Sequence, residues 1–325
     1  MLAYTVRRLL QAIPVLLVGS FVTFVLASEA GDPLTRLETH QPPLAPGIIA
    51  AERHRLRLDQ PLFERYWHWL TGILHGDWGP SVQHIDIGHQ IWGRLFVTVR
   101  LVLPAMILAL VIALIVGAIS AIKQYTVFDY TFTFIGFILL SMPLFWFAVL
   151  LKEQAINFND SIGHTVLYTV GDQSIPPPTG FIHQLGDSIG HVALPTIVLA
   201  MTSFAAWSRY VRSSMLEVRQ ADYVRLARSK GLAPGRVLIR HALRTALVPL
   251  TTVVALDLAA IFSGAVVTET VFQWHGMGDF LVNAIRNDDT YAVMAWLLLV
   301  AVIVILFNLL ADLLYARLDR RIRLV

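Results

Sequence analysis

The sequence predicts an all-α, polytopic membrane protein with six transmembrane helices. Of its 325 residues, 56% are hydrophobic and only 14% are charged, and the apolar residues gather in long runs. One soluble core cannot bury so many runs. Because backbone groups cannot stay unpaired in lipid, each run must cross as a helix. The runs are Leu9–Ser28, Phe96–Ile122, Thr131–Leu151, Val192–Trp207, Leu243–Val267 and Tyr291–Tyr315.

Each run is near or above the roughly 20 residues that a helix needs to cross a hydrocarbon core, the fourth being the shortest. Arg7 and Arg8 before the first run also suit a cleaved signal peptide. That run is longer than a typical signal core, however, and no small-x-small cleavage site follows it, so we expect a retained helix. Proline interrupts four of the runs and predicts kinks there. These prolines are Pro104, Pro143, Pro195 and Pro249.

The basic residues predict an orientation, because Lys and Arg favour the cytoplasmic loops of membrane proteins. The loops alternate between basic and weakly basic segments, and 16 of the 25 Lys and Arg fall on one side. Six crossings with both termini in the cytoplasm fit this alternation, which also accounts for the basic charge without a nucleic-acid partner. The residues on the basic side are Arg7, Arg8, Lys123, Arg209, Arg212, Arg219, Arg225, Arg228, Lys230, Arg236, Arg240, Arg244, Arg317, Arg320, Arg321 and Arg323.

We therefore divide the chain into an N-terminal transmembrane helix over 1–28, an extracytoplasmic segment over 29–95 and a main transmembrane domain over 96–325. The extracytoplasmic segment contains a stretch near 48–75 that favours a helix. Trp274, in the last external loop, is predicted to be an aromatic anchor at the membrane interface. Since the chain has no cysteine, disulfides, thiolate metal sites and cysteine nucleophiles are excluded.

The predicted cytoplasmic loop 209–244 carries a short amphipathic helix. Asp222 is expected to cap it, and Gly231 to stop it. Tyr223, Leu226 and Ala227 fall on one face at helical spacing. Two interpretations follow: an interfacial helix with snorkelling arginines, or a helix that docks in a groove of a cytoplasmic partner. A basic rim accompanies either one, formed by Arg225, Arg228 and Lys230.

The segment Tyr223–Leu232, followed by His241–Arg244, resembles the cytoplasmic loop of bacterial ABC-importer permeases of the dipeptide/oligopeptide branch. Arg225, Leu226 and Arg244 depart from the pattern of the wider superfamily but are usual in this branch. The resemblance extends over nearly the whole chain. Further matching motifs are Gly31-Asp32-Pro33, Leu58–Pro61, Gly76–Ser81, Ser141-Met142-Pro143, Arg212–Val218, Thr268–Phe272, Gly276-Met277-Gly278 and Asp312–Tyr315.

The resemblance implies a permease subunit of an ATP-driven, binding-protein-dependent importer of di- or oligopeptides. It implies a homologous second permease subunit, two cytoplasmic ATPase subunits and an extracytoplasmic peptide-binding protein as partners. The helix over 222–231 would couple the ATPases to the transmembrane helices through Asp222, Tyr223, Arg225, Leu226, Ala227, Arg228, Lys230 and Gly231. Since the sequence has no Gly-x-x-x-x-Gly-Lys-Ser/Thr loop, ATP hydrolysis is expected in the partners, and this chain needs no cofactor and is not an enzyme.

Ionisable groups inside a span are costly, so Asp257 in the fifth run needs an explanation. It either lines the translocation path or makes a hydrogen bond between helices. His75, His84 and His89 share the external segment, but none forms an i, i+4 pair with carboxylate support, so no metal site is predicted.

Three other functions stay open beside peptide import. An ion-coupled secondary carrier acting alone would use Asp257 as its coupling residue, whereas a nickel or metal-chelate permease would share the fold. A membrane scaffold without substrate flux is a further alternative. Within the peptide branch, the cargo stays open among dipeptides, longer peptides and glutathione-like molecules.

Overall fold

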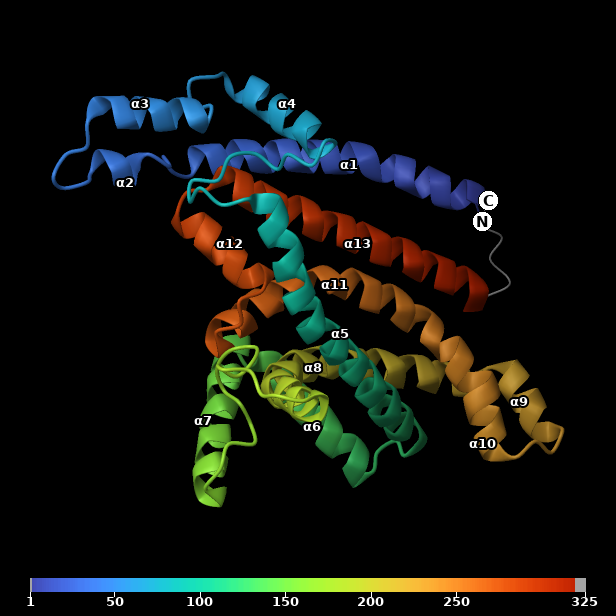
Figure 1. Ribbon diagram of the computed structural model, residues 1–325. Coiled ribbons are helices and arrows are strands. Elements are labelled where there is room, and N and C mark those ends of the chain that lie inside the picture. The colour runs from blue at the N-terminus through green and yellow to red at the C-terminus, as the bar shows by residue number, and fades with distance from the viewer. Residues whose placement is uncertain (1, 319–325) are drawn as a thin grey trace. The chain divides into compact units, whose positions relative to one another are not determined.

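The protein is described here by a computed structural model that covers residues 2–318 (Figure 1). All regular elements within these residues are helices. The chain forms two compact units, and each is described by itself. Unit 1 comprises residues 2–5, 99–274 and 304–318, and unit 2 comprises 6–98 and 275–303. The all-α, membrane-protein architecture predicted from the sequence is confirmed.

Unit 2 gathers most of α1 (Leu2–Glu29), then α2 (Thr35–Glu38), α3 (Pro46–Arg55), α4 (Leu62–Ile73) and the start of α5 (Ile87–Ile122). To these it adds α12 (Met277–Arg286) and the start of α13 (Thr290–Leu318). Its core is aromatic: the ring of Phe24 lies 5.6 Å from Tyr66, 6.4 Å from Trp69 and 6.1 Å from Tyr291, centroid to centroid.

Unit 1 continues α5 and adds α6 (Val127–Ser141), α7 (Leu144–Ile162) and α8 (Phe181–Gln220). It then has α9 (Asp222–Ser229), α10 (Pro234–Val237), a π-helical turn η1 (Leu238–Leu243) and α11 (Arg244–Phe272). Helix α8 packs against α6, α7 and α11, while α9 and α10 lie together beyond its C-terminal end (Figure 1).

Four helices of the described chain are long and apolar enough to cross a membrane: Tyr4–Glu29 within α1, α5, α8 and Thr290–Leu313 within α13. Helix α11, with 29 residues, covers the predicted fifth run. The six-span count, the orientation and the division into 1–28, 29–95 and 96–325 stay predictions.

The third predicted run, Thr131–Leu151, is not one continuous helix but breaks at Pro143, one of the four prolines expected to kink the spans. Helices α6 and α7 meet there at an angle of 109°. Met142 is extended, and Pro143 precedes the first residue of α7. Proline removes one backbone donor and disfavours helical geometry at the residue before it, so the run breaks at this point.

The stretch near 48–75 is helical as expected, but it forms two helices, α3 and α4, separated by residues 56–61. Pro61 occupies the cap position before α4, where its missing N–H costs no helical hydrogen bond. Trp274 is 1% exposed and therefore packs in the protein interior instead of anchoring at a membrane interface.

Candidate functional site

Helix α9 is the short helix expected in the 209–244 loop. One extended residue, Ala221, separates it from the C-terminal end of α8. It ends at Ser229, and Gly231 follows with a φ of +76°, a conformation that glycine adopts without the steric cost of a Cβ atom. The predicted stop at Gly231 therefore matches the structure.

Packing divides α9 into an inner and an outer face. Val224 is fully buried and Ala227 is 7% exposed, and both pack with Val237. Val218 of α8 and Leu232 cover the same small cluster. Ala227 therefore does not share an exposed face with Tyr223 and Leu226, as the helical spacing had suggested. The small side chain of Ala227 allows α9 to pack closely against Leu232 and Val237, which follow it in the chain.

Asp222 does not cap α9. Ala221 occupies the cap position, and no side chain accepts a hydrogen bond from the first turn. Asp222 is instead the first helical residue, and its exposed carboxylate accepts a hydrogen bond from Arg225. An acidic group in the first turn still interacts favourably with the helix dipole.

The outer face of α9 is exposed and carries positive charge. We define it as Tyr223, Arg225, Leu226, Arg228 and Lys230. The side chains of Tyr223 and Leu226 are 39% and 56% exposed. Two apolar residues inside a basic rim suit a partner groove with an apolar floor and an acidic edge. Such a groove would bury the apolar side chains and pair the basic ones with opposite charges.

Asp257, on α11, is held by a neighbouring helix. The indole N–H of Trp207 on α8 donates a hydrogen bond of 2.7 Å to the Oδ2 atom of Asp257. Trp207 is fully buried, whereas Asp257 is partly exposed. The interhelical bond expected as one alternative is therefore present. This hydrogen bond fixes the direction of the Asp257 carboxylate, while the partly exposed side chain stays accessible from the protein surface.

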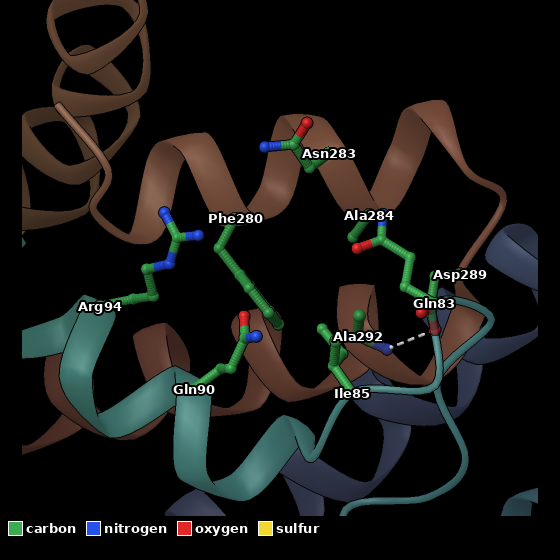
Figure 2. A pocket seen from close by; sticks show the side chains of 9 residues that line it. All are labelled: Gln83, Ile85, Gln90, Arg94, Phe280, Asn283, Ala284, Asp289 and Ala292. Carbon is green, nitrogen blue, oxygen red and sulfur yellow. Dashed lines mark hydrogen bonds between the residues drawn. The ribbon is translucent and has the colours of Figure 1, made fainter. Parts of the chain in front are cut away.

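Unit 2 contains a polar cavity that the sequence did not predict. Its volume is about 250 Å³, and Figure 2 shows Arg94 and Gln90 of α5 across it from Phe280 of α12. Arg94 donates a hydrogen bond of 2.7 Å to Asp279. Pockets for drug-sized ligands measure roughly 300–1,000 Å³, so this cavity is somewhat smaller than a typical ligand pocket. The lining residues are Gln83, Ile85, Gln90, Arg94, Phe280, Asn283, Ala284, Asp289 and Ala292.

Asp289, at the edge of this cavity, is 1% exposed and joins two segments. Its carboxylate accepts hydrogen bonds from the Ser81 hydroxyl at 2.5 Å and the Val82 N–H at 2.9 Å. It also accepts the Ala292 N–H at 3.1 Å, in the first turn of α13. Burial raises the pKa of Asp289 above its ordinary value of 3.8, although these donors oppose the change.

Among the described residues, no three His, Asp or Glu side chains gather in a way that could hold a metal ion. The side chain of His241 and residues 319–325, which hold Arg320, Arg321 and Arg323, lie outside the described residues.

Comparison with known proteins identifies the family. The family described as "Binding-protein-dependent transport system inner membrane component" matches residues 113–324. The N-terminal region of such membrane components matches residues 1–114. The two matches together span almost the whole chain, and the described function of the family is transport and not catalysis.

Curated relatives align over their full length. The oligopeptide transport system permease protein OppB of Mycobacterium tuberculosis is 37% identical over 323 residues, which is 99% of each chain. The dipeptide transport system permease protein DppB of Alkalihalophilus pseudofirmus is 38% identical, covering 99% of this chain and 100% of its own. DppB of Escherichia coli K12 is 35% identical over 99% of each chain. The chain therefore belongs to the binding-protein-dependent transport system inner membrane components, and it is a multi-pass protein of the inner membrane.

Proposed function

We propose that this chain is a transmembrane permease subunit of an ATP-driven importer of di- or oligopeptides. The observation that carries the proposal is full-length similarity, at 35–38% identity, to permease proteins named for dipeptide or oligopeptide transport. A helix with an exposed basic and apolar face adds support, because a permease subunit that does not hydrolyse ATP itself needs a contact surface for the ATPase.

The partners follow from this division of labour. A homologous second permease subunit completes the translocation path, and two cytoplasmic ATPase subunits supply the energy. An extracytoplasmic binding protein delivers the peptide. Lipid surrounds the apolar helices, and nucleic acid has no role.

The outer face of α9 is the proposed contact with an ATPase subunit. Tyr223 and Leu226 would enter an apolar groove, and Arg225, Arg228 and Lys230 would meet acidic groups at its edge. Asp222 orients Arg225, and Gly231 ends the helix so that the contact stays short. Ala227 contributes from the inner face by keeping α9 close to α8 and the following loop.

Asp257 is the proposed residue of the translocation path. Its partial exposure leaves the carboxylate accessible, and the Trp207 hydrogen bond limits the directions it can take. An oriented carboxylate can accept hydrogen bonds from the N–H groups of a passing peptide or attract its ammonium terminus.

The double variant Arg225→Glu/Leu226→Asp tests the function directly. Both side chains are exposed, so we expect insertion and folding to be kept. Co-purification of the ATPases and ATP-dependent peptide uptake should both be lost. Lys123→Glu is the matched control, since Lys123 is an exposed cation on the same predicted side but outside α9. Unimpaired uptake in the double variant would refute the role of α9.

A further inference from the structure

The C-terminal part of α8 is fastened to the first turn of α6 by a two-pronged ion pair. Arg212 Nε donates to Asp129 Oδ1 at 2.7 Å, and Arg212 Nη2 donates to Asp129 Oδ2 at 2.7 Å. The backbone N–H of Tyr125 donates to the same carboxylate at 3.0 Å. Asp129 is 2% exposed. A guanidinium that grips both oxygens of a buried carboxylate fixes distance and angle together.

The same part of α8 is held against α5. A Cβ atom added to Gly117 of α5 would lie 2.7 Å from the carbonyl oxygen of Ser208 and 2.7 Å from Cβ of Val211. Closer to the C-terminal end of α8, Arg219 donates a hydrogen bond to the backbone carbonyl of Ala121 on α5. The space left at the junction of α5, α6 and α8 is about 20 Å³, room for no more than a single water molecule.

Helix α9 follows this fastened stretch directly. Only Ala221 separates α9 from α8, and Val218 of α8 packs with Val224 and Ala227 on the inner face of α9. A displacement of α9 therefore displaces the end of α8. The effect on the other transmembrane helices depends on whether α8 slides past α5 and α6 or moves them with it.

We propose that Asp129 and Arg212 are positioning residues of the transport cycle, which transmit the displacement of α9 to α6 and, through the Gly117 contact, to α5. The inference rests on the proposed function and names a step within it. With the pair intact, α5, α6 and α8 move as one body. Without it, α8 slides, so ATP is hydrolysed while the transmembrane helices do not reorient.

Arg209 provides the matched control on the same helix. It lies one turn before Arg212, but its guanidinium lies over the ring of Phe137, 5.6 Å from the centroid. The hydrogen bonds to the Asp129 carboxylate come instead from Arg212 and from the backbone N–H of Tyr125. Arg209→Gln thus removes a neighbouring cation and leaves the fastening intact.

The experiment uses the complete transporter reconstituted in liposomes with a tripeptide as cargo, and it measures peptide molecules imported per ATP hydrolysed. Asp129→Asn keeps the size of the side chain and removes its charge. We expect the assembled complex to keep its ATPase activity and the import ratio to fall about tenfold, a usual size for a coupling between sites. Asp129→Glu should restore most of the ratio, and Arg209→Gln should leave it unchanged.

An Asp129→Asn complex that assembles and keeps the wild-type ratio would overturn the inference, as would a parallel loss of ATPase activity and import. Should Asp129→Asn fail to assemble, Arg212→Lys decides. It keeps the charge but loses the two-pronged grip, so an unchanged ratio contradicts the inference and a lowered one supports it. If the wild-type complex imports nothing with ATP, the proposed function itself fails and the inference fails with it.

Discussion

The two units hold their helices together by different means. Unit 2 interlocks aromatic rings around Phe24, whereas the buried side of α5 in unit 1 is a row of small residues. The row places Ala105, Ala109, Ala113, Gly117 and Ala121 at intervals of four. Small residues let helix backbones approach closely, but they interlock little. Directional bonds such as Asp129–Arg212 and Trp207–Asp257 therefore fasten unit 1, and a single substitution can release one of them.

The largest effect on stability is expected where backbones approach most closely. Gly117→Leu places side-chain atoms against the Ser208 carbonyl, which is backbone and cannot move aside alone. We expect a loss of about 3 kcal/mol, as is typical of overpacking, measured as a lower unfolding midpoint in detergent. Gly93→Leu, on the same helix, is the control, because a Cβ atom added to Gly93 has no neighbouring atom within 4 Å. Equal shifts in the two variants would contradict close packing at Gly117.

A smaller effect is expected at the aromatic core of unit 2. Gly79 has a φ of +90°, and an added Cβ would lie 2.6 Å from the ring of Tyr291. Gly79→Ala should cost about 2 kcal/mol, from the clash and the strained backbone together. Gly76→Ala has a similar φ of +82° and open space, so it measures the backbone cost alone. If both variants lose the same stability, the ring contact contributes nothing.

The buried carboxylate of Asp289 should make unit 2 depend on pH. Because its pKa is raised in the folded protein, the folded state binds the proton more tightly than the unfolded chain. Stability should therefore fall as the pH rises from 3.8 through the raised value. Asp289→Asn lacks this titration. Between neutral pH and about pH 4, acidification should raise the unfolding midpoint of the wild type relative to that of the variant.

Parallel pH profiles of the wild type and Asp289→Asn would exclude this titration. A profile that changes in the opposite direction would mean that the donors Ser81, Val82 and Ala292 outweigh the burial of the charge.

The smallest effect on stability is expected at Asp257. Asp257→Asn keeps an oxygen that can accept the Trp207 N–H, so the loss of stability should be about 0.5 kcal/mol. If the charge serves the translocation path, peptide uptake should nevertheless fall several-fold. Asp257→Ala removes the acceptor and should lower both stability and uptake. Unchanged uptake kinetics in Asp257→Asn would mean that Asp257 serves only the interhelical hydrogen bond to Trp207.

Sequence periodicity located the helices well because apolar runs and turn residues are local signals. It failed where the outcome depends on a distant partner. The buried face of α9 includes Ala227 because Val237 returns to cover it, and spacing alone does not indicate which side that will be. Asp129 and Arg212 stand 83 positions apart, so their pairing had no local signal. The cavity in unit 2 was missed because residues near 83–94 and 280–292 form it jointly.

Energy transfer from partner ATPases through α9 is the central claim, and reconstitution tests it most directly. Liposomes that contain this chain, the second permease subunit, the ATPases and the binding protein should accumulate peptide when ATP is supplied. Liposomes with this chain as their only protein should accumulate none, under an ion gradient or with ATP. Accumulation by the chain alone would contradict the claim.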